Sequence, residues 1–429
     1  MINLSGKRLL FMGATDMMKS AVILAKSMGI TTIVVDYNEK SPAKAFADKS
    51  YLVSTANIDE ILKICKKEGI DGVFFGYSEL NQYYTLDICT KLNLPFYADK
   101  NQINILANKK NFKNYCKKFN ITVVPEYDIN NINELPVIVK PVDSYSGKGI
   151  SICYDLKELK ECIDQAINES KTKSYLIEKY MDPDKYGVVG IYYSIQNGIV
   201  ALSSMADRIM YKFNNNRQLN TALIYPSVYL DRYLAIEDKA VKDMIKDMGI
   251  QNGTIFIEGC VDKEKFYFWE AGFRLCGAEQ DILPTYINKV NIKKMLICHA
   301  LTGKMDDKDN MALEDPYFKN KKACNGIIFL NKGMVTKISG VDEIKKLDGV
   351  INFSQLKSVN DKITDKDIGT LNQSFARFHI VADSIEELKE LIYKILNKII
   401  VLDENGNNMI LNTFDENTLN LKIKKQFVK

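Results

Sequence analysis

The sequence predicts an α/β protein of two to four compact units that begins with a doubly wound parallel sheet. Its 429 residues are too many for one small core. Over the first hundred residues, short apolar runs alternate with helical patterns, and strands that alternate with crossover helices form parallel sheets. The expected strands are 7–13, 32–36 and 72–76, and the expected helices are 17–28, 58–67 and 80–92.

The composition excludes several classes of protein. The net charge of +4 is spread along the chain without the basic block that a nucleic-acid groove needs. The nine cysteines form no Cys-x-x-Cys motif and only two histidines are present, which argues against a zinc site. No apolar stretch reaches the roughly 20 residues that span a bilayer. We therefore expect a soluble, cytoplasmic protein with no nucleic-acid or membrane partner.

The first sheet should bind its ligand beyond the carboxyl ends of its strands, near Gly13, Asp36 and Glu79. Asp36 lies where a dinucleotide-binding protein carries its ribose-binding acid. However, Thr15 and Met18 stand where the G-x-G-x-x-G turn requires glycines. NAD binding is therefore not the first choice.

The rest of the chain changes character. A helix is expected at 109–119, and strands are expected at 135–141, 149–154 and 174–178 around a helix at 156–169. A long hairpin should turn at Asn197-Gly198, and a helix at 229–248 should follow it. The polar segment 302–322 indicates a boundary, and strands at 326–330, 334–338 and 375–382 with a helix at 385–397 predict a small α+β unit.

Two glutamates stand out in a predicted hairpin. Glu258 ends one apolar run and Glu270 begins Glu-Ala-Gly-Phe-Arg, with a charged turn between them. If the turn centres near Glu264, the two carboxylates face each other, and like charges opposed across strands are destabilising. Such a pair calls for a cation, and oxygen ligands of this kind suit Mg²⁺. Two solvated surface glutamates would fit the pair equally well when it is considered alone.

Two segments upstream could bind a nucleotide. Lys140 ends an apolar strand, and the loop 143–149 reads Asp-Ser-Tyr-Ser-Gly-Lys-Gly. Its glycines let backbone N–H groups reach phosphate oxygens, although the loop lacks the Walker pattern and also fits a flexible hairpin tip. The segment 175–181 runs from a strand into a polar break, which either offers backbone hydrogen bonds to an adenine or simply ends a strand.

In this order the segments resemble the ATP-grasp superfamily of carboxylate–amine and carboxylate–thiol ligases. The resemblance covers roughly residues 1–310, and its motifs lie between Asn108 and Gly277. It implies a pre-ATP-grasp domain at 1–100, an ATP-grasp domain at 101–305 with a mobile lid at about 122–185, and a C-terminal α+β subdomain at 306–429. Carried over by position, it implies nucleotide contacts from Lys109, Lys140, Ser144, Ser146, Gly147, Gly149, Glu178, Lys179 and Met181, Mg²⁺ (or Mn²⁺) ligands Glu258 and Glu270, and catalytic roles for Arg274 and Lys140.

The chain departs from this family at two positions. Family members commonly carry asparagine two residues after the second glutamate, where this chain has Gly272. A ribose-binding acid is expected shortly after the hinge, where the chain reads Lys185-Tyr186, so that Asp182 or Asp184 would have to substitute. These departures leave open whether one metal or two are bound.

The resemblance implies an enzyme that uses ATP and Mg²⁺ to activate a carboxylate as an acyl phosphate and join it to an amine. It also implies small-molecule partners and a homodimer, which is common in similar enzymes. Substrate contacts are expected from Glu79, Arg208 and Lys212, although surface charge explains the last two nearly as well. The alternatives are an enzyme of the carbamoyl-phosphate or biotin-carboxylase type that acts on bicarbonate, and a non-catalytic ATP-binding regulator. His379 is expected to be a structural histidine.

Overall fold

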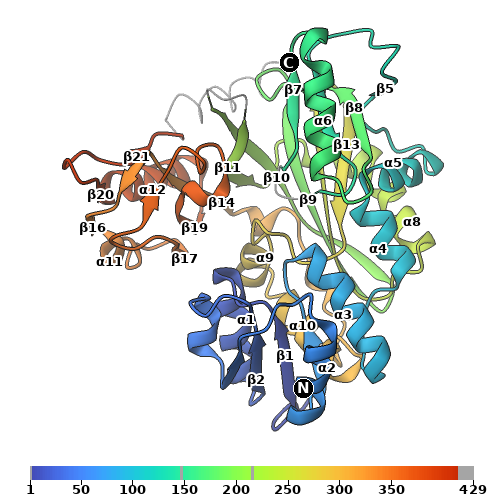
Figure 1. The fold of residues 1–429 in the computed structure, drawn as a ribbon, viewed down its shortest axis with the longest axis vertical. Coiled ribbons are helices and arrows are strands. Elements are labelled where there is room, and N and C mark those ends of the chain that lie inside the picture. The colour runs from blue at the N-terminus through green and yellow to red at the C-terminus, as the bar shows by residue number, and fades with distance from the viewer. Residues whose placement is uncertain (1, 145–147, 214–216, 414–429) are drawn as a thin grey trace.

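The computed structural model describes residues 2–144, 148–213 and 217–413. Its N-terminal part is a four-stranded parallel sheet in the order β3-β2-β1-β4, which confirms the predicted doubly wound unit (Figure 1). Alternate residues of β1 pack on opposite faces, Leu9 and Phe11 toward α1 and Leu10 and Met12 toward α2 and α3. The elements are β1 (Arg8–Met12), α1 (Asp16–Ser27), β2 (Thr31–Val35), η1 (Pro42–Phe46), β3 (Lys49–Tyr51), α2 (Ile58–Glu68), β4 (Gly72–Phe74) and α3 (Glu79–Leu92).

A small antiparallel sheet forms a separate layer at the top of Figure 1. Its strand order is β5-β8-β6-β7, and one face is covered by a helix whose apolar side includes Leu159, Ile163 and Ala166. Two helices precede it in the chain. The elements are α4 (Lys100–Ala107), α5 (Lys109–Lys118), β5 (Glu126–Tyr127), β6 (Val137–Pro141), β7 (Ser151–Cys153), η2 (Leu156–Glu158), α6 (Leu159–Glu169) and β8 (Tyr175–Lys179).

A nine-stranded antiparallel sheet runs through the rest of the molecule in the order β13-β12-β9-β10-β11-β14-β19-β17, with β21 paired to β14. The sheet crosses the boundary predicted near residue 306, because β11 pairs directly with β14. The domain limits themselves stay predictions. The strands are β9 (Gly187–Gln196), β10 (Ile199–Lys212), β11 (Gln218–Tyr225), β12 (Gly253–Asp262), β13 (Lys265–Gly272), β14 (Lys322–Leu330), β17 (Val350–Gln355), β19 (Ser374–Ala382) and β21 (Ile410–Leu411).

Helices and short strands complete this part. The predicted helix 229–248 is two helices that meet at Glu237, where φ is −117°. The predicted strand 334–338 is two strands that pair in different small sheets. The elements are α7 (Leu230–Ile236), α8 (Asp238–Asp247), α9 (Ile282–Ile287), α10 (Ile292–Thr302), η3 (Met311–Leu313), η4 (Phe318–Asn320), β15 (Gly333–Met334), β16 (Lys337–Ser339), α11 (Val341–Ile344), β18 (Lys362–Ile363), η5 (Leu371–Gln373), α12 (Ile385–Lys398) and β20 (Ile400–Leu402).

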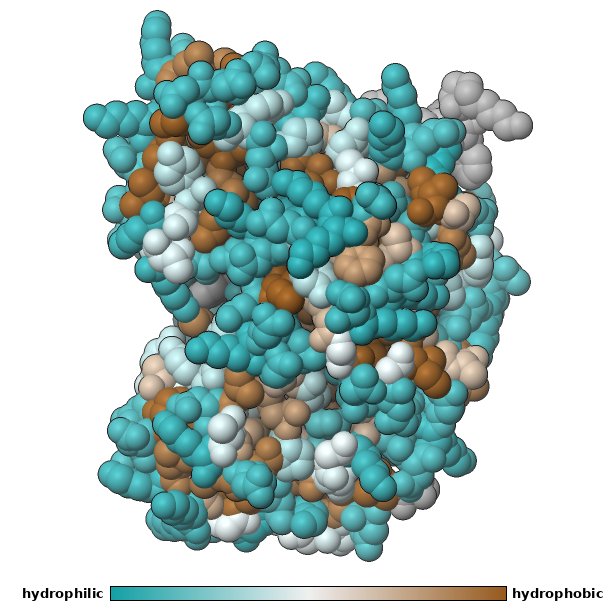
Figure 2. Space-filling model, turned by 90° about the vertical axis from the view of Figure 1, so that its right-hand side faces the viewer, coloured by the Kyte–Doolittle hydropathy of each residue, from teal (hydrophilic) through white to brown (hydrophobic). Residues whose placement is uncertain are grey.

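The N-terminal unit is joined to the large sheet by α10. Met295, Leu296 and Ala300 of this helix belong to the same core as Leu9 and Phe11 of β1. Gly72 of β4 lies so close to α10 that a Cβ there would be 2.1 Å from the carbonyl oxygen of Ala300. Within the described residues, no helix is long and apolar enough to cross a membrane. The face in Figure 2 is mostly hydrophilic and is indented between its upper and lower parts.

Candidate functional site

Glu258 and Glu270 face each other across the β12–β13 hairpin, as the sequence predicts. The chain turns at Lys263-Glu264, and from there the two strands pair residue by residue up to Gly259 and Phe268. A β-bulge then shifts the register, so that Glu258 lies opposite Glu270 and Trp269 is the extra residue. Without the bulge, Glu258 would face Trp269. The bulge therefore creates the carboxylate pair.

Each carboxylate of this pair has a cation beside it. Arg208 of β10 forms an ion pair with Glu258, and the Nζ atom of Lys109 lies 3.5 Å from Oε2 of Glu270. Burial raises the pKa of Glu258, and the Glu270 charge adds to this while Arg208 opposes it. Burial also acts to raise the pKa of Glu270, but the Lys109 and Lys140 ammonium groups outweigh it and hold this pKa at about 2. Glu270 is therefore charged at neutral pH.

Gly190 lies beside the path of the Arg208 side chain to Glu258. It lies in β9, directly between Glu258 of β12 and Ala206 of β10. A Cβ at Gly190 would be 3.6 Å from Cδ of Arg208 and 3.0 Å from Nε2 of Gln280. The Arg208 side chain thus passes Gly190 at van der Waals distance, and a Cβ would press instead on Gln280. Gly190 was not among the predicted site residues.

Lys140 lies in a buried charge network rather than free in a cleft. Its Nζ is 2.6 Å from Oε2 of Glu178, and the Nζ of Lys113 is 2.8 Å from the other oxygen, Oε1. Lys113 also lies 2.7 Å from Glu126 and is completely buried. Lys113 was not among the predicted site residues. Its position four residues after Lys109 puts both lysines on one face of α5.

The predicted adenine hinge is only partly available. The Glu178 side chain is held by the two lysines, and the backbone N–H groups of Lys179 and Tyr180 donate to the carbonyl groups of Pro125 and Pro136. The Lys179 side chain forms an ion pair with Glu134 at 3.1 Å. These contacts occupy groups that the sequence analysis assigned to adenine. Met181 is half-buried at the end of the segment.

The predicted phosphate loop begins at the site. The Lys109 ammonium donates to the carbonyl oxygen of Ser144 at 2.8 Å, and the Ser144 hydroxyl donates to the carbonyl of Lys148 at 2.7 Å. Gly149 has a φ of +72°, which favours glycine at that position. Ser146 and Gly147 lie outside the described residues.

Arg274 reaches the same region from the loop after β13. Its Nη2 is 3.8 Å from Glu79 at the start of α3, and its guanidinium lies 5.0 Å from the centre of the Phe256 ring. The Phe256 ring also explains Gly272: a Cβ there would be 2.4 Å from two ring atoms. An aromatic ring therefore fills the space that an asparagine side chain at position 272 would need.

Lys212 is not brought to the glutamates. Its Nζ lies 2.5 Å from Asp182 and 2.6 Å from Asp184, at the base of the small sheet. These are the two acids that could have substituted for the ribose-binding acid, and both form an ion pair with this lysine. Of the weakly expected substrate residues, only Arg208 and Glu79 therefore lie beside the hairpin glutamates or Arg274.

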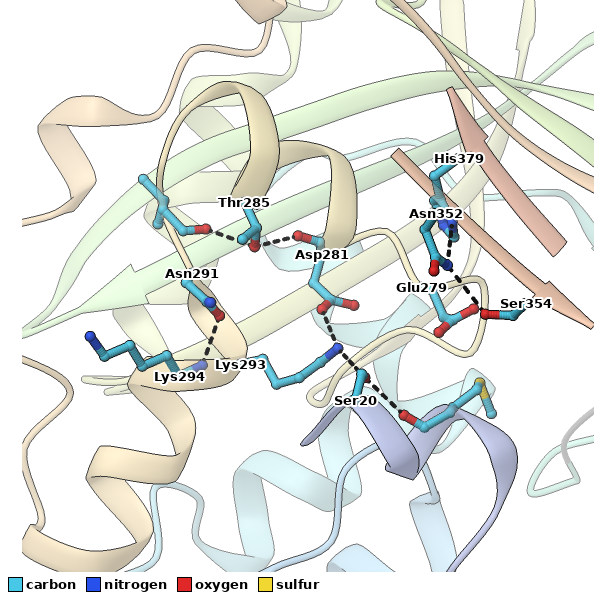
Figure 3. Close-up of polar contacts among 12 residues, drawn as sticks. Ser20, Glu279, Asp281, Thr285, Asn291, Lys293, Lys294, Asn352, Ser354 and His379 are labelled. Carbon is cyan, nitrogen blue, oxygen red and sulfur yellow. Dashed lines mark hydrogen bonds and ion pairs between the residues drawn. The ribbon is translucent and has the colours of Figure 1, made fainter. Parts of the chain in front are cut away.

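A second polar cluster follows Arg274 along the chain (Figure 3). The Lys293 ammonium lies 3.1 Å from Asp281 and donates to the hydroxyl of Ser20 at 2.8 Å. Arg377 of β19 lies 3.6 Å from Glu279. His379, two residues further along β19, is buried beside Asn352, and burial lowers its pKa to about 3. The imidazole is therefore neutral, as expected for a structural histidine.

Two family models match the chain over the regions just described. Residues 9–81 match the PylC-like N-terminal domain, and residues 108–279 match the ATP binding domain of the carbamoyl-phosphate synthase L chain. This chain contains an ATP-grasp domain. The recognition made from the Lys109-to-Arg274 motifs is thereby confirmed.

Curated relatives of this ATP-grasp protein include formate-dependent phosphoribosylglycinamide formyltransferases. The protein from Francisella tularensis is 28% identical over 201 residues, which cover 43% of this chain and 50% of the relative. The protein from Sulfurisphaera tokodaii is 27% identical over 207 residues, with 45% and 52% covered. The matched region thus spans about half the length of these relatives.

Solved structures extend the likeness to the whole fold. The L-amino acid ligase from Bacillus licheniformis aligns with a TM-score of 0.76 at 18% identity, covering 94% of this chain and all of the ligase. The biotin carboxylase domain of Hydrogenobacter thermophilus 2-oxoglutarate carboxylase, a dimer in complex with MgADP, ADP and bicarbonate, aligns with a TM-score of 0.77 at 17% identity, covering 96% and 95%. Phosphoribosylglycinamide synthetase from Anaerococcus prevotii gives 0.71 at 20%, covering 93% and 100%. At these identities the likeness establishes the fold.

Proposed function

We propose that this ATP-grasp protein is an ATP- and Mg²⁺-dependent ligase that joins a carboxylate to an amine through an acyl phosphate. The observation that carries the proposal is the convergence of Glu258, Glu270, Lys109, Lys140 and Arg274 from three parts of the chain: α5, β6, and the β12–β13 hairpin with the loop that follows it. Two carboxylates and three cations are what the transfer of a highly charged phosphoryl group needs. The same residues stand in the order expected of the superfamily.

The metal fits this set of donors. Glu258 and Glu270 offer only oxygen atoms, which Mg²⁺ prefers, and a nucleotide-bound Mg²⁺ typically takes one or two carboxylates and completes its shell with phosphate and water. The Phe256 ring over Gly272 leaves no space for a side-chain ligand at that position. When bound, the ion would supply positive charge beside the β- and γ-phosphates. Glu258 and Glu270 are the residues that would hold it.

The proposed reaction has two steps. A carboxylate oxygen of the substrate attacks the γ-phosphorus of ATP, the bond to the β–γ bridging oxygen breaks, and ADP leaves. The amine nitrogen then attacks the acyl carbon, the bond to the phosphate oxygen breaks, and phosphate leaves as the amine loses a proton. The protein forms no covalent bond. Lys109, Lys140 and Arg274 neutralise charge on the transferring group, and Arg208 is placed to bind the substrate carboxylate.

A screen for ADP release tests this proposal. ADP that forms only when a carboxylate and an amine are both present supports the ligase. ADP that forms with bicarbonate alone would instead support a carboxylase or carbamoyl-phosphate type of enzyme. Nucleotide binding without turnover over a broad panel would support a regulator. Mass spectrometry of the products identifies the bond that is formed.

The metal site is tested with a matched pair of variants on one hairpin. Glu270→Ala should lower Mg²⁺-dependent ADP release by at least about a hundredfold, because it removes one of two metal ligands. Glu264→Ala, in the exposed turn of the same hairpin, should retain the activity of the unmodified protein. Wild-type turnover in Glu270→Ala, with the melting temperature unchanged, would overturn the assignment of the metal site.

A further inference from the structure

Arg208 forms an ion pair with Glu258, one of the two carboxylates that are proposed to bind the metal. Its guanidinium group is ion-paired with Oε2 of Glu258 and is mostly buried, with 15% of the side chain exposed. Among the described residues, Glu258 is its only salt-bridge partner. The pair lies inside the site, where the charge of Glu270 acts on both of its members.

Arg208 and a metal ion would compete for this carboxylate. Mg²⁺ demands oxygen ligands at about 2.0–2.1 Å in near-ideal octahedral geometry, and a guanidinium group on the same carboxylate places a second positive charge next to the ion. Once Glu258 turns to the metal, Arg208 loses its only described salt-bridge partner. An unpaired, mostly buried cation is costly, so the freed guanidinium favours the arrival of a new anion.

We propose that Arg208 is exchanged at this site: it neutralises Glu258 before the metal binds and is then released to bind the carboxylate of the substrate. This inference rests on the proposed function. It adds that Mg²⁺–nucleotide and carboxylate each raise the affinity for the other by the same factor, because equilibrium linkage is reciprocal. The Arg208 side chain passes β9 at Gly190, which contributes no side chain of its own there.

The metal affinity of a variant without Arg208 distinguishes two roles of this residue: exchange with the metal, and support of the Glu258 side chain. If Arg208 merely buttressed Glu258, its removal would weaken the metal site. If it competes with the metal, removal should tighten binding of the Mg²⁺ complex of the ATP analogue AMP-PNP, by about tenfold on the scale of typical coupling energies. Arg208→Met keeps much of the apolar stem and removes the charge.

The experiment uses the full chain and its single tryptophan. Trp269 lies next to Glu270 in the bulge, so its fluorescence reports on the hairpin, and calorimetry gives an independent affinity. Arg232→Met is the matched control, because Arg232 pairs with Glu264 at the exposed turn of the same hairpin, 3.7 Å away. Tighter binding in Arg208→Met and unchanged binding in Arg232→Met are expected. Equal or weaker binding in Arg208→Met would overturn the exchange.

Acetate serves as a simple carboxylate probe for the second half of the inference. In the unmodified protein, acetate should tighten Mg²⁺–AMP-PNP binding relative to chloride at the same ionic strength, and in Arg208→Met this effect should vanish. No effect of acetate on the unmodified protein would overturn the coupling. Failure of the unmodified protein to bind Mg²⁺–AMP-PNP at all would overturn the proposed function itself, which is a different and distinguishable result.

Discussion

Replacement of Lys113 by methionine should destabilise the protein, because this lysine is buried and pairs with two carboxylates. Its ammonium lies 2.7 Å from Glu126 and 2.8 Å from Glu178, and its side chain is completely buried. The network has two positive charges, on Lys113 and Lys140, and two negative charges, on Glu126 and Glu178, so its net charge is zero. Removing Lys113 leaves one negative charge in excess around Glu178, whose side chain is 2% exposed.

The expected loss follows from that burial. Removing one partner of a buried ion pair costs about 3–5 kcal/mol, because the other charge is left uncompensated. Lys140 still pairs with Glu178 at 2.6 Å, and the Glu126 side chain is about a quarter exposed, so we expect a value near the lower end, about 3 kcal/mol. The loss should appear in the free energy of unfolding at pH 7.

Urea unfolding, followed by far-UV circular dichroism and Trp269 fluorescence, measures the effect. Lys110→Met is the matched control, since Lys110 is an exposed lysine on the same helix, and it should change the stability by less than about 0.5 kcal/mol. Adding Glu178→Gln to Lys113→Met should cost less than the sum of the two single changes. A Lys113→Met protein as stable as Lys110→Met would refute the reasoning.

Two further predictions concern single residues. Gly272→Asn should lower the stability by about 1–3 kcal/mol through overpacking against the Phe256 ring, and Phe256→Ala in the same chain should reduce that penalty; melting temperatures check both. Burial lowers the pKa of His299 to about 4 from 6.5, so its contribution to stability is complete above pH 6.5 and is lost as the pH falls toward 4. His299→Gln should therefore flatten the pH dependence of unfolding in this range by at most on the order of 3 kcal/mol, and an unchanged slope would count against a buried neutral imidazole.

Local patterns in the sequence predict much of this fold. The N-terminal sheet follows from apolar runs separated by helical periodicity, and the β9–β10 hairpin follows from Asn197-Gly198, which adopt φ values of +52° and +77°. The pairing of Glu258 with Glu270 was also predicted correctly, but the prediction did not include the β-bulge that produces it. The turn lies at Lys263-Glu264, and the bulge at Trp269 supplies the offset that a turn centred on Glu264 would have given.

The features that the sequence did not reveal depend on contacts between distant segments. Strand β11 was missed, yet it joins the two halves of the large sheet through its pairing with β14. Glu178 lies in a strand whose pattern fits a nucleotide hinge, but only the fold shows that Lys113 and Lys140 hold its side chain. Gly272 resembled a lost ligand until the Phe256 ring was seen to occupy the adjacent space.

The candidate site is electrically balanced before any ligand arrives. Glu258 is paired by Arg208, Glu270 lies beside Lys109, and Glu178 is paired by Lys140, with each cation contributed by a different segment. Mutual repulsion between the hairpin carboxylates is thereby relieved within the protein itself. On the proposed function, Mg²⁺–ATP would redistribute these pairs, because the metal would take the carboxylates and the phosphates would take the lysines. Breaking the existing pairs would then offset part of the attraction between the site and the nucleotide, and the proposed exchange predicts that the released cations select the next anion to bind.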